Sequence, residues 1–130
     1  GDVEVVKPPT VAAQEDTSRV FDEAIDAVVD AYHKLLDAGV PAEDARYLLP
    51  NAAETKIVIT MNIRELLHFL SLRCCNRAQW EIRELANRML ELVRPTAPYI
   101  FMDAGAPCVR GVCPEGNMTC GNPYPKVVRE

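Results

Sequence analysis

The chain lacks a long apolar run, because no segment approaches the roughly 20 consecutive apolar residues that span a bilayer. It also lacks the cationic start and apolar block of a secretory signal. It has no cationic surplus either, since fourteen Lys and Arg face nineteen Asp and Glu, for a net charge of −5. Proteins that bind nucleic acid in bulk are usually basic overall. We therefore expect a cytoplasmic protein that binds neither membrane nor nucleic acid.

The remaining composition is typical of a folded protein. The chain has 130 residues, of which 48% are hydrophobic and 25% charged, both close to globular averages. This length fits one ordinary domain or part of a larger one. Six of the ten Arg lie between Arg64 and Arg94, in a window without Lys. Because guanidinium groups suit phosphate and carboxylate, this window is a candidate anion-binding region, although four interleaved Glu also fit a solvated helix face.

In the first half of the chain, the apolar residues are mostly spaced as on one face of a helix. Residues 1–16 contain Pro8 and Pro9 and are expected to form an irregular leader. Helix-capping residues at Thr17 and Ser18 then precede apolar residues at helical spacing, which predicts an amphipathic helix over 18–38 that stops at Gly39. Pro41 suits the start of a second, short helix over 41–48.

The second half is predicted to hold one strand and two helices. Residues 55–61 are rich in β-branched side chains and predict a strand. Asn62 and Glu65 have capping-box spacing before a helix over 63–73, and a fourth helix is expected over 78–94. The predicted fold class is thus α+β and mostly helical, with about four helices and one strand of an antiparallel sheet. A single strand needs a partner, which the N-terminal residues, the tail or another chain would have to supply.

Four motifs follow one another in the middle of the chain. They are Ala-Arg-Tyr-Leu-Leu-Pro at 45–50, Thr-Met-Asn-Ile-Arg at 60–64, His-Phe-Leu-Ser-Leu-Arg at 68–73 and Ala-Gln-Trp-Glu-Ile-Arg at 78–83. In this order and at these spacings, they resemble the C-terminal half of the flavin-dependent thymidylate synthases, the thymidylate synthase complementing protein family. The resemblance covers about residues 40–90 without a gap. Agreement over all the motifs is specific, whereas any one of them alone would not be.

The resemblance implies a reaction and partners. Members of the family methylate dUMP to dTMP with methylene-tetrahydrofolate, using FAD as the cofactor and NADPH as the reductant. They are homotetramers whose sites are shared between subunits. By position, Arg46 is similar to a ligand of the dUMP phosphate or sugar, and Arg73 to the catalytic arginine that holds and polarises the dUMP pyrimidine. Asn62, Arg64 and His68 are similar to FAD ligands.

The positions of these residues agree with two ligands on different sides of one helix. Arg64 and His68 are four residues apart and share a helix face, while Arg73 is nine residues beyond Arg64 and points to the opposite side. Structural explanations are also open. Asn62 can be a helix cap, His68 a half-buried core histidine and Arg64 a surface ion-pair partner. Arg46 can cap the short helix, and Arg73 can be solvated beside Arg77.

The family's Arg-His-Arg signature, followed by two serines, does not occur in these 130 residues. We therefore expect residues 17–103 to form the C-terminal part of such a domain, which needs the N-terminal half or other subunits for activity. One alternative is a non-catalytic nucleotide-binding or assembly module derived from the family. The other alternative is a small zinc-binding interaction domain.

The five cysteines are odd in number and show no C-x-x-C spacing. Without an export signal, free thiols or a metal are simpler expectations than a disulfide framework. The tail, residues 104–130, is rich in Gly and Pro and carries Cys108, Cys113 and Cys120. Zinc requires four ligands, so Cys74 or Cys75 would have to join them. Free thiols or an oxidation-dependent disulfide explain the same residues, and the sequence alone assigns no metal ligand.

Overall fold

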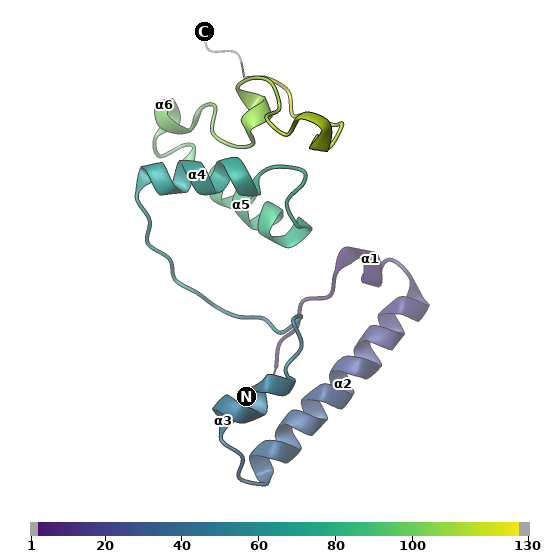
Figure 1. Ribbon diagram of the computed structural model, residues 1–130. Helices are drawn as coiled ribbons and strands as arrows, with labels where there is room; N and C mark the ends of the chain where they lie inside the picture. The colour runs from purple at the N-terminus through teal and green to yellow at the C-terminus, as the bar shows by residue number, and fades with distance from the viewer. Residues whose placement is uncertain (1–2, 128–130) are drawn as a thin grey trace. The chain divides into compact units, whose positions relative to one another are not determined.

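The computed structural model describes residues 3–127, and in that part of the chain all regular elements are helices (Figure 1). The chain divides into two compact units, Gly1–Val58 and Ile59–Glu130, and each is described by itself. The mostly helical character predicted from the sequence is confirmed. Among the described helices, none is both long and apolar enough to cross a membrane.

The leader predicted to be irregular over residues 1–16 contains a short helix, and the long helix predicted over 18–38 is confirmed with an earlier start. Helix α1 spans Pro9–Ala12, and α2 spans Glu15–Asp37, so α2 starts before the predicted Thr17 and Ser18 caps. Pro9 stands in the first turn of α1, where its missing N–H costs nothing. The Thr17 hydroxyl donates a 2.7 Å hydrogen bond to the carbonyl of Val11, which ties the two helices together. Thr17 thus lies within the first turn of α2 and is not its N-cap.

Helix α2 is amphipathic, and none of its residues is buried. It ends as predicted before Gly39, whose φ of +84° lies in the left-handed region that glycine tolerates. The apolar residues predicted to share one face are all partly exposed; they are Phe21, Ile25, Val28, Val29, Tyr32, Leu35 and Leu36. The short helix predicted over 41–48 is confirmed as α3, Ala42–Ala45, continued by a 3₁₀ turn over Arg46–Leu48.

The strand predicted over residues 55–61 is wrong for the described part of the chain. An antiparallel bridge joins Val5 and Ala53, and Glu54 donates a 2.8 Å backbone bond to Glu4, but the pairing goes no further. The residues that follow Glu54 are extended and exposed to solvent, and the exposed fraction of Val58 is 98%. β-Branched side chains favour an extended backbone, yet a strand forms only where a neighbouring backbone satisfies its N–H and C=O groups.

The second unit contains α4, Ile63–Arg73, and α5, Trp80–Val93, which pack against each other. The helix predicted over 63–73 is confirmed at both ends, and the one predicted over 78–94 is confirmed with slightly shorter bounds. Asn62 caps α4 by accepting a 2.9 Å bond from the backbone N–H of Glu65. Gln79 caps α5 in the same way, through the N–H groups of Glu81 and Ile82.

The hydrophobic core of this unit lies between α4, α5 and the chain that follows them. Helix α6, Pro98–Phe101, is a single turn, and Phe101 anchors it in the core. The buried members of the core come from three separate stretches of sequence; they are Leu70, Cys74, Ala86, Leu90, Phe101 and Ala104. Leu70 is fully buried and holds the centre of α4 against this cluster.

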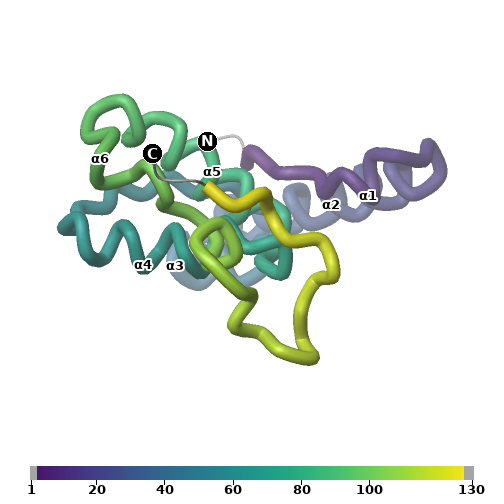
Figure 2. Tube along the Cα trace, turned by 90° about the horizontal axis from the view of Figure 1, so that it is seen from above, coloured from purple at the N-terminus to yellow at the C-terminus, as the bar shows by residue number. Residues whose placement is uncertain are grey.

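The tail leaves the core as a wide loop with two short 3₁₀ turns, Pro107–Val109 and Gly116–Met118 (Figure 2). Val127 donates a 2.9 Å backbone bond to the carbonyl of Val109, which closes the loop. Most side chains between these residues are exposed. The predicted loop-rich tail is confirmed, and the hydrogen bond shows that the loop returns to its own base.

Candidate functional site

One face of α4 carries the two side chains that the family resemblance assigns to FAD. Arg64 and His68 are one helical turn apart and exposed, on the side of α4 away from Leu70. Within residues 3–127, neither side chain has a hydrogen bond or ion pair, so the surface ion pair and the buried histidine considered above are both wrong. The helix therefore presents a guanidinium and an imidazole to solvent on one face.

Arg73 is the last residue of α4 and is also exposed. Because α4 is continuous from Arg64 to Arg73, the two guanidinium groups start from opposite sides of the helix, about 13 Å apart along its axis. Among the described residues, the Arg73 side chain has no polar partner, which leaves its fork of donors available. The two arginines thus lie on different sides of α4, and their assignment to different ligands stays a prediction.

Asn62 already has a structural task. Its side-chain oxygen accepts the Glu65 N–H, which is one of the donors left unpaired at a helix start. Its amide nitrogen has no partner among residues 3–127 and points a further donor into solvent. The cap explanation is therefore confirmed, and a contact with FAD would use the other end of the same amide.

Arg46 belongs to the first unit, whereas Asn62, Arg64, His68 and Arg73 belong to the second. It is the first residue of the 3₁₀ turn after α3, and its side chain is exposed. In the described part of the chain, its guanidinium bonds to no helix carbonyl, so the capping role considered for it is wrong. The structure places the other four residues on α4 and its cap, with Arg73 on the opposite side of the helix from Arg64, and leaves Arg46 in the first unit.

The residues that hold the tail to the helix pair escaped the sequence analysis. Asn76, in the turn between α4 and α5, donates a 2.9 Å bond to the carbonyl of Asn122 and accepts a 2.8 Å bond from the hydroxyl of Tyr124. Arg83 donates to the backbone carbonyl of Asn76 and holds the turn from the other side. No local pattern relates Asn76 to residues more than forty positions away, so only the folded chain reveals this contact.

Cys74 and Cys75, adjacent in sequence, lie in different surroundings. Cys74 is buried in the core, whereas Cys75 is partly exposed at the turn after α4. Burial raises the pKa of the Cys74 thiol from 9.0 to about 11, and the Arg94 guanidinium opposes this rise. Cys74 is therefore a packing residue that keeps its proton at neutral pH.

This difference predicts how the thiols react. At pH 8 and in the presence of a chelator, we expect iodoacetamide to modify the exposed Cys120 rapidly and Cys74 at least about a hundredfold more slowly, since the raised pKa alone lowers the thiolate fraction by about that factor. Peptide mapping by mass spectrometry over time measures both rates. Denaturant should remove the difference, and equal rates in the folded chain would contradict the burial of Cys74.

Comparison with known proteins identifies the family of this chain. Residues 1–99 match the sequence model of the thymidylate synthase complementing protein family. Proteins named flavin-dependent thymidylate synthase are similar to the chain: one from Geobacter sulfurreducens is 63% identical over 116 residues, and one from Clostridium tetani 45% identical over 130 residues. These alignments cover 89% and 88% of this chain, and 50% and 52% of the two relatives. The chain belongs to the thymidylate synthase complementing protein family and spans about half the length of these curated relatives.

The side chains on this face of α4 fit the charge of a phosphate-bearing cofactor such as FAD. Arg64 and His68 offer two exposed donors on one helix face, and neither is bonded to another side chain or backbone group within residues 3–127. A flavin nucleotide is long and carries phosphate groups, which such donors bind as charge-assisted partners. The exposed face of α4 is therefore a candidate surface for such a cofactor, on a helix that packs against the core of the second unit.

Proposed function

We propose that this chain supplies part of the active site of a flavin-dependent thymidylate synthase, which methylates dUMP to dTMP with methylene-tetrahydrofolate. Membership of the family carries the proposal, and the exposed, unpaired cations of α4 support it. FAD, reduced by NADPH, supplies the hydride when bound. The chain's own residues bind and orient the two nucleotides.

Arg64 and His68 hold the flavin nucleotide from the solvent face of α4, and Asn62 adds its free amide donor at the start of the helix. The Asn62 cap serves this arrangement because it stabilises the first turn, on which Arg64 stands. A charge-assisted hydrogen bond of this kind is worth about 1.5–3 kcal/mol. Two such contacts on a rigid helix therefore contribute substantially to the affinity for FAD.

Arg73 and Arg46 hold dUMP. Arg46 binds the phosphate or sugar, and Arg73 donates to a carbonyl oxygen of the pyrimidine. Carbon 5 of the uracil ring must act as the nucleophile toward the methylene carbon, and the enolate-like form that makes it nucleophilic carries negative charge on the neighbouring carbonyl oxygen. A guanidinium placed beside such an oxygen stabilises that charge without having to reorganise, which is electrostatic catalysis. Arg73 is therefore the residue of this chain to which we assign a catalytic role.

The remainder of the site comes from an N-terminal half or from other subunits of a homotetramer, with dUMP and folate as substrates. Two features of the chain support assembly. Helix α2 buries none of its residues although it carries an apolar face. The extended residues after Glu54 expose Ile57, Val58 and Ile59 at 62–98%. The five free cysteines fit a cytoplasmic setting, where thiols stay reduced.

Release of label from dUMP tests the proposal. The chain alone, given C5-tritiated dUMP, FAD, NADPH and methylene-tetrahydrofolate, should release tritium at background rates, because the signature residues that close the family's site are not among its 130 residues. A mixture with the N-terminal half of a close relative should show flavin absorbance on the purified complex and tritium release. Robust turnover by the chain alone would show that it needs no complement.

The same assay separates the enzyme from a binding module. A non-catalytic relative would bind dUMP or FAD in the complex and release no tritium. The matched control is the complex formed with Arg73→Lys, which keeps the charge but loses the planar fork of donors. This variant should retain flavin absorbance and lose most of the turnover. Turnover equal to that of the unchanged complex would remove Arg73 from the catalytic role.

A further inference from the structure

A cavity of about 230 Å³ lies in the second unit, between the α4–α5 turn and the tail loop. Its wall contains four of the chain's five cysteines, from two distant stretches of sequence; they are Cys75, Cys108, Cys113 and Cys120. The proposed function uses none of them. Four thiols around one small cavity match the number of ligands in a structural tetrahedral metal site.

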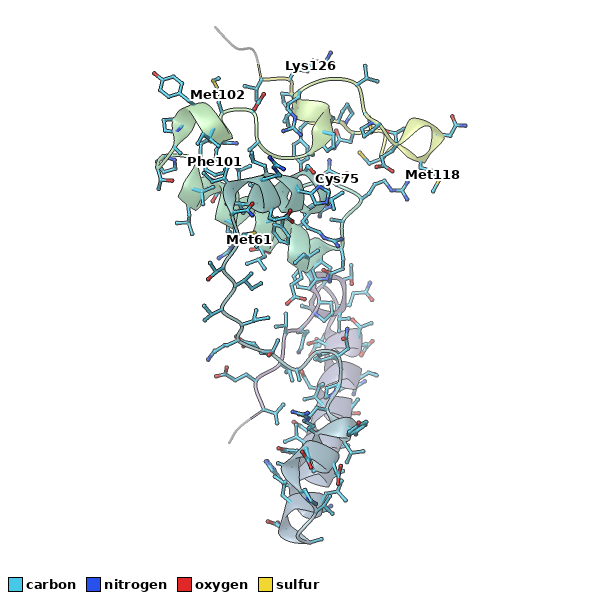
Figure 3. All side chains as sticks on the ribbon, turned by 60° about the vertical axis from the view of Figure 1, so that its left-hand side comes forward. Met61, Cys75, Phe101, Met102, Met118 and Lys126 are labelled. Atoms are coloured by element: carbon cyan, nitrogen blue, oxygen red, sulfur yellow. The ribbon has the colours of Figure 1, made fainter. Side chains whose placement is uncertain are left out.

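The structure distinguishes Cys75 from its neighbour as the fourth thiol. Cys75 lines this cavity and is partly exposed to solvent, and Figure 3 shows it on the side of the turn that faces the tail. Cys74 is packed into the hydrophobic core with Leu70 and Leu90 and does not line the cavity. From the sequence, either Cys74 or Cys75 could join the tail cysteines. In the structure, the α4–α5 turn places Cys75, and not Cys74, in the wall of the cavity.

Polar contacts anchor the tail loop beside the cavity. Asn76, which follows Cys75, is hydrogen-bonded to Asn122 and Tyr124, and Arg77 donates to the backbone carbonyl of Met118. These bonds join the chain on both sides of Cys120 to the two residues that follow Cys75. The tail has no hydrophobic core of its own, since most of its residues beyond Cys108 are exposed. A loop of this kind needs a cross-link to hold it in one shape.

The backbone around Cys120 already has a feature that suits a thiolate ligand. Gly121 has a φ of +71°, and the backbone N–H of Asn122 lies 3.4 Å from the Cys120 sulfur. Backbone N–H groups directed at a sulfur help to orient it as a metal ligand. The thiol of Cys120 also lies 3.4 Å from the Asn122 carbonyl, to which it donates while protonated.

The wall of the cavity carries one charged residue of each sign, Arg77 and Glu115. Arg77 would offset part of the negative charge of a tetrathiolate–metal group. As they stand, no three His, Cys, Asp or Glu side chains among residues 3–127 converge tightly enough to hold an ion. The cavity must therefore contract around the ion, and a loop built of single turns and glycines allows this movement.

We infer that Cys75, Cys108, Cys113 and Cys120 bind one Zn²⁺ ion and that this ion fastens the tail to the α4–α5 turn. Zinc prefers tetrahedral sulfur ligands and is borderline-soft, so a cavity with four thiols selects it over oxygen-seeking cations. Binding displaces a proton from each of the four thiols, and no oxidant or reductant takes part. The role is structural, because four protein ligands leave no open position on the metal.

Metal content of the untagged chain tests this inference. The chain is expressed with added zinc and purified under reducing conditions, and metals are measured by mass spectrometry. We expect about one zinc per chain. Replacement by Co²⁺ should give the intense visible absorption of tetrahedral cobalt with thiolate charge-transfer bands. Iron in place of zinc, or no metal and no cobalt spectrum, would overturn the assignment.

The adjacent cysteines provide a matched pair of variants. Cys75→Ala should weaken Zn²⁺ affinity by at least about tenfold, because even changes in groups that only support the ligands cost about 10–100-fold. Cys74→Ala should keep its zinc, since Cys74 does not line the cavity. Equal zinc affinity in the two variants would overturn the role of Cys75.

A measurement on the unchanged chain avoids any folding defect of the variants. Zinc should protect the four cavity cysteines from alkylation, and a chelator should expose Cys75, Cys113 and Cys120 together. Protection of a different set of cysteines would contradict the inference. A disulfide between any two of the four, found by mass in freshly purified reduced protein, would also contradict it, because those thiols would then be unable to bind the ion.

Discussion

Arg73→Ala in the complemented enzyme should weaken dUMP binding by about tenfold to a hundredfold and leave FAD binding within about threefold of its starting value. The physical reason is the loss of charge-assisted hydrogen bonds to the pyrimidine, each worth about 1.5–3 kcal/mol. Arg73 is exposed at the end of α4, and its side chain makes no polar contact within residues 3–127, so its removal should hardly affect stability. Isothermal titration with dUMP, and separately with FAD, measures the two affinities.

The matched control is Arg64→Ala on the opposite side of the same helix. It removes the same charge, and we expect the reverse pattern, with FAD weakened and dUMP little changed. Thermal unfolding of both variants should stay close to that of the unchanged complex. If both ligands were weakened equally by either substitution, the division of α4 into a flavin face and a uridylate face would be wrong.

Leu70→Ala should destabilise the second unit by about 2–5 kcal/mol, the range measured when a fully buried large aliphatic side chain is truncated. Leu70 is completely buried and contributes to the cluster that holds α4 against α5 and Phe101. Because small folded units have only about 5–15 kcal/mol of stability, this loss should lower the urea midpoint sharply or abolish folding of the unit. Far-UV circular dichroism during urea titration reports it.

Leu72→Ala is the control for this effect, on the same helix and with the same change of side chain. Leu72 is 50% exposed, so its truncation should cost less than about 1 kcal/mol. The denaturant slope should be similar for both variants, since neither changes the surface that unfolding exposes by much. A Leu72→Ala midpoint as low as that of Leu70→Ala would mean that the core is not centred on Leu70.

The Zn²⁺ inference and the proposed function are independent of each other. The cysteine cavity lies at the turn after α4, whereas Arg64 and His68 stand on the body of the helix. A chain without zinc could still make the proposed flavin contacts, and a chain that binds zinc could fail to make them.

The helices and their ends were largely predictable from the sequence by itself. Asn62 and Glu65 predicted the start of α4, Gly39 the end of α2, and apolar spacing the existence of both helices. The order of motifs from Ala45 to Arg83 also indicated the family, which the comparisons confirm. These features were readable because capping, helical periodicity and short motifs depend on residues within a few positions of one another.

Only the tertiary structure decided the rest. Residues 55–61 have strand-forming side chains, but whether they form a strand depends on a partner backbone, and residues 3–127 provide none beyond the bridge at Ala53. The grouping of Cys75 with the tail cysteines depends on how a loop of Gly and Pro turns back through Asn76 and Tyr124. Strand pairing and the walls of a cavity are set by residues far apart in sequence, so no local pattern encodes them.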